Sequence, residues 1–172
     1  MPVSQINQNS LATGVPSATN ITTGTLPSAQ LPTGSVLQVV QGTSTGLTNT
    51  ASATPVTTGF SVSITPKFAS SKILVIANPS WAVNSSGSQN GTAVMHIYRG
   101  GSSRYQMYCR TFNYNNATGL YQNNAQALIY LDSPATTSST AYTLFFELAS
   151  GASTTFNSDG GFSSMTLMEI AA

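Results

Sequence analysis

Charged side chains are the scarcest feature of this sequence. They make up 5% of its 172 residues, whereas about a quarter of the residues in ordinary soluble domains are charged. The formal net charge is +1, so the chain lacks the basic field that would attract nucleic acid or an anionic membrane surface. Solubility must rest on Ser, Thr, Asn, Gln and Gly, which is typical of proteins whose surfaces are largely contacts.

Cysteine and long apolar runs are also lacking. Cys109 is the single cysteine, which excludes an intrachain disulfide framework. The sequence has no run of about 18 apolar residues that could span a bilayer. Its first ten residues have neither the basic start nor the apolar stretch of a secretory signal. We therefore expect no membrane partner.

Residues that could perform catalysis are few, because the chain has one histidine, His96, and only four acids. His96 has no Gly-x-Ser-x-Gly motif to supply a nucleophile, and we expect it to be a strand residue that is buried or at a subunit contact. For Glu147 and Glu169 we expect an ion pair with arginine rather than the facing carboxylates of a glycosidase. A structural zinc site lacks ligands. We predict a protein that is not an enzyme and has no cofactor and no metal.

Residues 1–34 contain no charge, and the first charged residue of the whole chain is Lys67. They show no helical or alternating period, and their prolines favour extended backbone. Such a segment cannot bury enough apolar surface to fold alone. A flexible leader is one interpretation, but disordered tails usually stay solvated through charge. We therefore predict an extended arm that orders against protein, with contacts at Val15, Ile21, Leu26 and Leu31.

From residue 35 onward, short apolar segments between turn residues predict β-strands. Residues 72–78 hold four consecutive apolar residues, as a strand buried on both faces would. Residues 92–99 and 104–114 predict a hairpin around a Gly-Gly pair. About nine or ten strands at this spacing predict one all-β domain over residues 35–172, an antiparallel β-sandwich of jelly-roll type. A β-prism or an immunoglobulin-like sandwich is the alternative topology.

Aromatic and amide side chains gather between residues 105 and 124. Rings that stack and amides that bond to hydroxyl groups are what sugar or protein recognition requires. The alternative is ordinary strand residues and an Asn-rich loop, with some of the rings packed between subunits, and we favour this alternative slightly. The possible recognition surface consists of Tyr105, Tyr108, Tyr114, Asn115, Asn116 and Tyr121.

Four segments carry a resemblance to a known family. Residues 22–40 (TTGTLPSAQLPTGSVLQVV) resemble the linker that enters a C-terminal domain of bacteriophage tail-fibre and head-surface proteins. Residues 60–66 (FSVSITP) and 70–75 (SSKILV) are similar to early strands of that domain. Residues 164–170 (SMTLMEI) are similar to its closing strand. The resemblance implies a trimeric, β-rich protein of the virion surface that is assembled in the host cytoplasm.

Two functions follow from the resemblance and from the arm. The first is a homotrimeric capsid decoration (cement) protein, which attaches to the major capsid protein of the shell through its arm. The second is a short tail fibre or receptor-binding protein that is held by a tail or baseplate protein and recognises a host surface glycan or protein. The low charge also predicts self-association, because neutral strand faces would otherwise stay exposed as wide patches. No nucleic acid is expected as a partner.

Overall fold

The computed structural model describes residues 31–85, 90–112 and 120–172 of the chain. Apart from one short 3-10 turn, η4 (Ser158–Gly160), the regular elements in these ranges are strands. The strands are β1 (Val36–Ser44), β2 (Thr48–Thr50), β3 (Val56–Ile64), β4 (Lys72–Asn78), β5 (Ser80–Ser85), β6 (Gly91–Arg99), β7 (Ser102–Thr111), β8 (Leu120–Ala125), β9 (Leu128–Asp132), β10 (Thr140–Ser150), β11 (Ser153–Phe156) and β12 (Ser163–Ile170).

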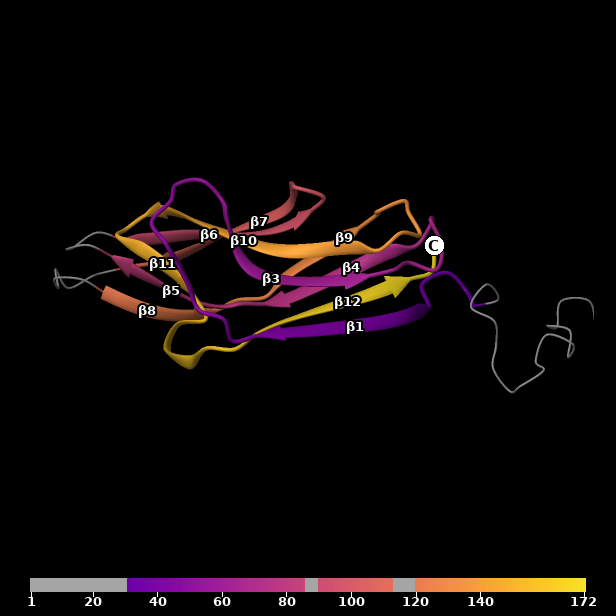
Figure 1. The fold of residues 1–172 in the computed structure, drawn as a ribbon, viewed down its shortest axis with the longest axis horizontal. Helices are drawn as coiled ribbons and strands as arrows, with labels where there is room; N and C mark the ends of the chain where they lie inside the picture. The colour runs from indigo at the N-terminus through magenta and orange to yellow at the C-terminus, as the bar shows by residue number, and fades with distance from the viewer. Residues whose placement is uncertain (1–30, 86–89, 113–119) are drawn as a thin grey trace, which may run out of the picture.

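The strands form three four-stranded sheets, ordered β1-β12-β4-β9, β2-β11-β5-β8 and β3-β10-β6-β7, and every pairing is antiparallel. The first two sheets have matching orders, because β1 leads into β2, β4 into β5, β8 into β9 and β11 into β12. They are therefore two halves of one long sheet that is interrupted at the same level in all four strands (Figure 1).

Joining these halves leaves eight composite strands in the described part of the chain. In one layer their order is first, eighth, third and sixth, and in the other it is second, seventh, fourth and fifth. Each strand of the first half of the chain thus pairs with its counterpart from the second half, which is the arrangement of a jelly roll. The predicted antiparallel jelly-roll sandwich is confirmed.

Alternating side chains fill the space between the two layers. On β10, Tyr142, Leu144, Phe146 and Leu148 all point into the core, as their spacing of two residues requires. The ring of Phe156 on β11 lies 6.5 Å from that of Phe146. Each fully buried side chain of this kind stabilises the fold by about 1.5–3 kcal/mol. The remaining core residues include Phe60, Val62, Ile64, Ile73, Val75, Trp81, Met95, Ile97, Leu128, Met165 and Leu167.

A buried acidic residue, Asp132, joins the two layers where β9 ends. Its carboxylate lies 2.7 Å from Nε of Arg99 on β6 and accepts a 2.7 Å hydrogen bond from the hydroxyl of Tyr142 on β10. Burial and the hydrogen bond to Asp132 raise the pKa of Tyr142, so its hydroxyl stays a donor. The arginine ion pair that we expected for Glu147 or Glu169 is thus formed by Asp132, whose strand β9 brings it opposite Arg99.

Glu169 on β12 is fully buried and is held by neutral donors. Its carboxylate accepts hydrogen bonds from Nε2 of Gln38 at 2.6 Å and from the backbone N–H groups of Lys67 at 2.7 Å and Phe68 at 3.3 Å. Burial acts to raise the pKa of Glu169, but these hydrogen bonds outweigh it and lower the pKa. Glu169 thereby fastens the β3–β4 connection and β1 to the closing strand.

Candidate functional site

The predicted arm meets the sandwich at a β-turn. Ser35 N–H donates to the carbonyl of Pro32 at 3.1 Å, and Gly34 within this turn has φ 88°, which glycine adopts without strain. Gly34 N–H also donates to Ala171 O at 2.8 Å, next to the last residues of the chain. Leu31 is half-buried. The other predicted arm contacts, Val15, Ile21 and Leu26, lie outside the described residues, so the arm and its boundary at residue 34 stay predictions.

Two tyrosines of the predicted recognition surface lie on opposite faces of β7. Tyr105 points between the layers, where its ring stacks on Tyr130 of β9 at 5.9 Å. Tyr108 points outward and is 55% exposed. The remaining members, Tyr114, Asn115 and Asn116, lie outside the described residues, as does the side chain of Tyr121 on β8. The structure therefore does not bring Tyr105 and Tyr108 onto one surface, and recognition by this region stays a prediction.

The outer side of the β1-β12-β4-β9 sheet is apolar where a solvent-facing antiparallel sheet is usually polar. The pairing register places Val39, Met168, Leu74 and Leu131 side by side across all four strands. The next row contains Ile76 beside Ile129 and is completed by Gln41 and Thr166. The row at the end near residue 36 contains Val36 beside Ile170 and is completed by Lys72. We call this set the outer apolar face: Val36, Val39, Leu74, Ile76, Ile129, Leu131, Met168 and Ile170.

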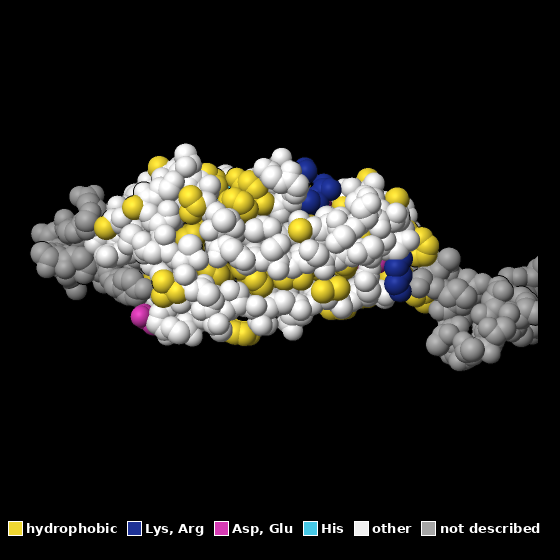
Figure 2. All heavy atoms as spheres, viewed as in Figure 1, with side chains coloured by type: hydrophobic (Ala, Val, Ile, Leu, Met, Phe, Trp, Pro, Cys, Tyr) yellow, Lys and Arg dark blue, Asp and Glu magenta, His cyan; other side chains and the backbone are white. Residues whose placement is uncertain are grey.

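The most exposed members of the outer apolar face lie on its two edge strands. Val36 and Val39 on β1 are 50% and 55% exposed, and Ile129 and Leu131 on β9 are 57% and 50% exposed. Apolar rows on an unpaired edge invite pairing with another chain unless charge or proline blocks them. In the view of Figure 2 the Lys and Arg side chains are confined to two small groups, and white atoms, which belong to the backbone and to uncharged polar side chains, cover most of the surface.

The outer side of the opposite sheet, β3-β10-β6-β7, is polar by comparison. Ser61 and Thr143 pair across β3 and β10, and their hydroxyl groups lie 3.0 Å apart. The edge strand β7 carries exposed Arg104 and Arg110. Charges on an edge strand discourage pairing with a further strand. The exposed side chains on the two outer sides of the sandwich therefore differ in polarity.

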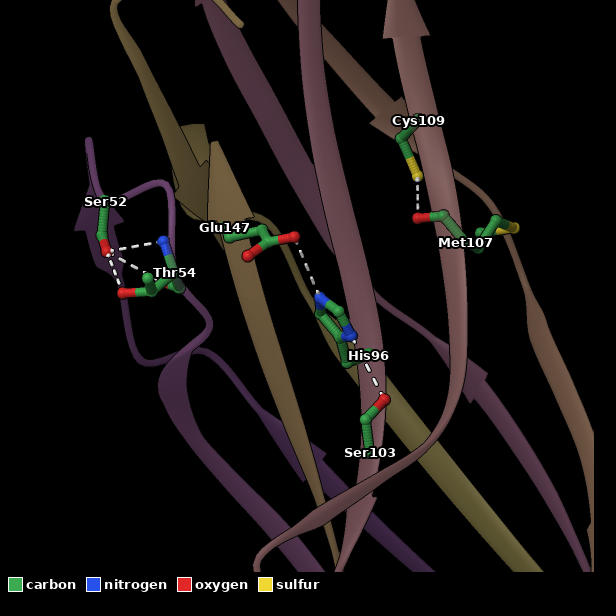
Figure 3. A network of polar contacts seen from close by, with 7 residues as sticks. All are labelled: Ser52, Thr54, His96, Ser103, Met107, Cys109 and Glu147. Atoms are coloured by element: carbon green, nitrogen blue, oxygen red, sulfur yellow. Dashed lines mark hydrogen bonds and ion pairs between the residues drawn. The ribbon is translucent and has the colours of Figure 1, made fainter. Parts of the chain in front are cut away.

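His96 lies on this polar side, where it is 3% exposed (Figure 3). Its Nε2 is 3.6 Å from Oε1 of Glu147 on β10, and its Nδ1 shares a 3.3 Å hydrogen bond with the hydroxyl of Ser103 on β7. Tyr98 packs against the edge of the imidazole and stacks on Phe145 at 4.1 Å. The prediction that His96 is a buried strand residue is confirmed.

The pKa of His96 is lowered, because burial penalises the imidazolium more than Glu147 stabilises it. The histidine is therefore neutral near pH 7. Within the described ranges, no group of three or more His, Cys, Asp or Glu side chains is placed to hold a metal ion. His96, Glu147 and Ser103 form a packed polar contact in a sheet.

Cys109 of β7 is likewise buried, pointing into the sandwich rather than toward His96. Burial raises the pKa of its thiol to about 12, so the thiol stays protonated and unreactive.

Among the described residues, no helix is long and apolar enough to cross a membrane.

Comparison with known proteins gives no family. No protein-family model matches the chain, and no curated protein matches it. Solved structures that superpose on it include the VP2 subviral particle of infectious bursal disease virus, with 14% identity and a TM-score of 0.40 over 78% of this chain. A structure of the Gx strain of that virus superposes with 13% identity and a TM-score of 0.39 over 80% of this chain. The chain spans only 32% and 39% of the lengths of those two chains. At this level the likeness carries no argument about what the protein does.

Sequence reasoning did not find the outer apolar face, although its signal was present. The apolar run at residues 73–76 predicted a strand buried on both faces. The structure buries Ile73 and Val75, whereas Leu74 and Ile76 are only half-buried on the outer side. The same apolar run is also expected for a strand whose second face is covered only when subunits assemble.

Proposed function

We propose that this chain is a non-enzymatic structural protein of a virion surface, and specifically a homotrimeric decoration (cement) protein of a bacteriophage capsid. In this proposal residues 1–34 attach the protein to the major capsid protein of the shell. The observation that carries it is the contrast between the outer apolar face and the polar outer side of the opposite sheet. A subunit with one neutral apolar side is suited to lasting contact with protein.

Energetics support an assembled state. Four members of the outer apolar face are at least half exposed in the single chain. Burying a whole Val, Leu or Ile side chain contributes about 1.5–3 kcal/mol, so covering the exposed halves of these four contributes a few kcal/mol per subunit. The surface also has few charges to desolvate, which keeps the cost of burying it low.

The arm is tested on purified capsids. Residues 1–34 are deleted, and in a second variant of full length Val15, Ile21, Leu26 and Leu31 are replaced by serine. We expect both changes to reduce occupancy on capsids at least tenfold, because the apolar contacts of the arm are removed. The matched control replaces Ser10, Ser17 and Ser28 by alanine and should bind as the unchanged protein does. Full occupancy by the deleted and serine variants would exclude attachment through the arm.

A second candidate function is recognition of a host glycan or surface protein, which the exposed side chains of β7 favour. Tyr108 is 55% exposed and Phe112, which follows the strand, is 58% exposed. The amide of Gln106 is also exposed on the outer side. A glycan array and a cell-adsorption assay with the purified protein test this function. We expect replacement of Tyr108 by serine to abolish any binding found, and absence of binding on natural hosts would remove this candidate.

A further inference from the structure

We propose that a second copy of this chain covers the outer apolar face, and that the β9 side of one copy contacts the β1 side of the next around a threefold axis. This inference rests on the trimer of the proposed function and names the surface that forms it. The contact is heterologous, meaning that each copy contributes two different edges, and the ring closes after three copies.

Charge identifies the chain itself as the partner. The outward-facing residues of β1 and β9 carry no formal charge. A typical soluble protein, about a quarter of whose residues are charged, would have to desolvate charges against these apolar rows. A copy of this chain, with 5% charged residues, presents a matching neutral surface. Lys72 lies at the end of the face, where solvent screens it.

Area favours a ring over a two-chain pair. Four strands spaced about 4.8 Å apart and about seven residues long give a face of about 19 Å by 23 Å. This is roughly 400 Å² in projection, a small patch beside the roughly 800 Å² of accessible surface that each partner buries in a typical stable interface. A face-to-face pair would use this area alone. In a ring, each copy also buries the flanks of its two edge strands against two neighbours.

The distribution of exposure selects the edges that meet. The exposed apolar residues are at the two margins of the face, Val36 and Val39 on β1 and Ile129 and Leu131 on β9, while the central Leu74 is half-buried. The other sheet ends in β7, whose Arg104 and Arg110 protect that edge. β1 and β9 are thus the two uncharged apolar margins that can meet, whereas the charged edge of β7 is less suited to such a contact.

Light scattering of the full-length protein tests the contact. The unchanged protein is expected to have three times the 17.8 kDa mass of the chain. Leu131→Lys and Val39→Lys each place an ammonium group in the contact and should reduce the mass threefold. The matched control, Tyr108→Lys, lies on the opposite outer side and should remain a trimer. Circular dichroism checks that every variant keeps its strands, and Leu131→Ser provides a milder change if a lysine variant fails to fold.

Cross-linking tests which edges meet. In the variant that carries both Val39→Cys and Leu131→Cys, a short bis-maleimide should give covalent species of up to three chains on a denaturing gel. Each single variant should give mainly the uncross-linked chain. The native Cys109 is buried and its pKa is raised to about 12, so it stays silent. Linked species that stop at two chains would mean a twofold contact and overturn the ring.

The outcomes separate this inference from the proposed function. A protein that is trimeric but keeps its mass in both lysine variants overturns the inference and leaves the capsid function standing. If those variants stay trimeric but lose capsid occupancy, the face binds the shell and the inference is again overturned. Capsid binding by a protein that is a single chain in solution overturns the trimer and the inference together, and leaves attachment through the arm.

Discussion

At the scale of single residues, His96 is a titratable group whose surroundings oppose its protonation. Burial lowers its pKa, and Glu147 at 3.6 Å compensates only in part. The unfolded chain, in which histidine has a pKa of about 6.5, therefore binds this proton more readily than the folded protein. By linkage, the contribution of neutral His96 to stability is complete above about pH 6.5 and is lost as the pH falls through that value toward the folded pKa.

The prediction for His96 concerns the pH dependence of unfolding. We expect the free energy of unfolding to decrease between about pH 7 and pH 5, and His96→Gln to remove that part of the decrease. The effect should be small, because Glu147 at 3.6 Å offsets part of the burial penalty on the imidazolium. Urea titrations at several pH values measure it. An unchanged slope in His96→Gln would mean that another group titrates.

At the scale of elements, Gly91 allows β6 and β5 to approach closely. A Cβ at residue 91 would overlap the side chain of Val83 on β5 and lie 2.8 Å from the hydroxyl of Thr111 on β7. Both neighbours are buried, so neither can move away freely. We expect Gly91→Ala to destabilise the protein by about 1–3 kcal/mol, the usual cost of overpacking. Thermal unfolding measures this, and Gly46→Ala, whose Cβ would lie 3.7 Å from Ser44, should be neutral.

The local sequence pattern predicted the strands better than it predicted how the strands pack against one another. The hairpin of residues 92–99 and 104–114 was predicted, because it depends on neighbours in sequence. Gly91 begins β6 and is required by the close approach of Val83 on β5, which belongs to a different sheet, so the local sequence pattern does not reveal it. The shared break in four strands was not predicted, because it depends on how the layers pack.

The candidate site was also predicted only as far as local sequence pattern allows. Tyr105 and Tyr108 differ by an odd number of residues, so the twofold period of a strand could have placed them on opposite faces. The apolar run at residues 73–76 signals only one strand of the outer apolar face, because the rows of the face combine residues from four strands far apart in sequence. The register that aligns Val39, Leu74 and Leu131 is a property of the folded sheet.

At the scale of the whole molecule, the low charge predicts how assembly responds to salt. If trimers form through the outer apolar face, their stability should not decrease between about 0.05 M and 1 M NaCl, because there are no ion pairs for salt to screen. Sulfate should strengthen the association, since it increases the effective burial of apolar surface. Sedimentation velocity at several salt concentrations checks both. Dissociation at high salt would indicate a contact that depends on charge.

The two ends of the sandwich are separated along its long axis. Residues 31–35 and the C-terminus lie at one end, whereas β5, β6 and β8 extend to the other (Figure 1). If residues 1–34 attach the protein as proposed, attachment acts at the end of the sandwich where Glu169 makes its contacts. The far ends of β5, β6 and β8 would then be presented away from the attached end of the protein.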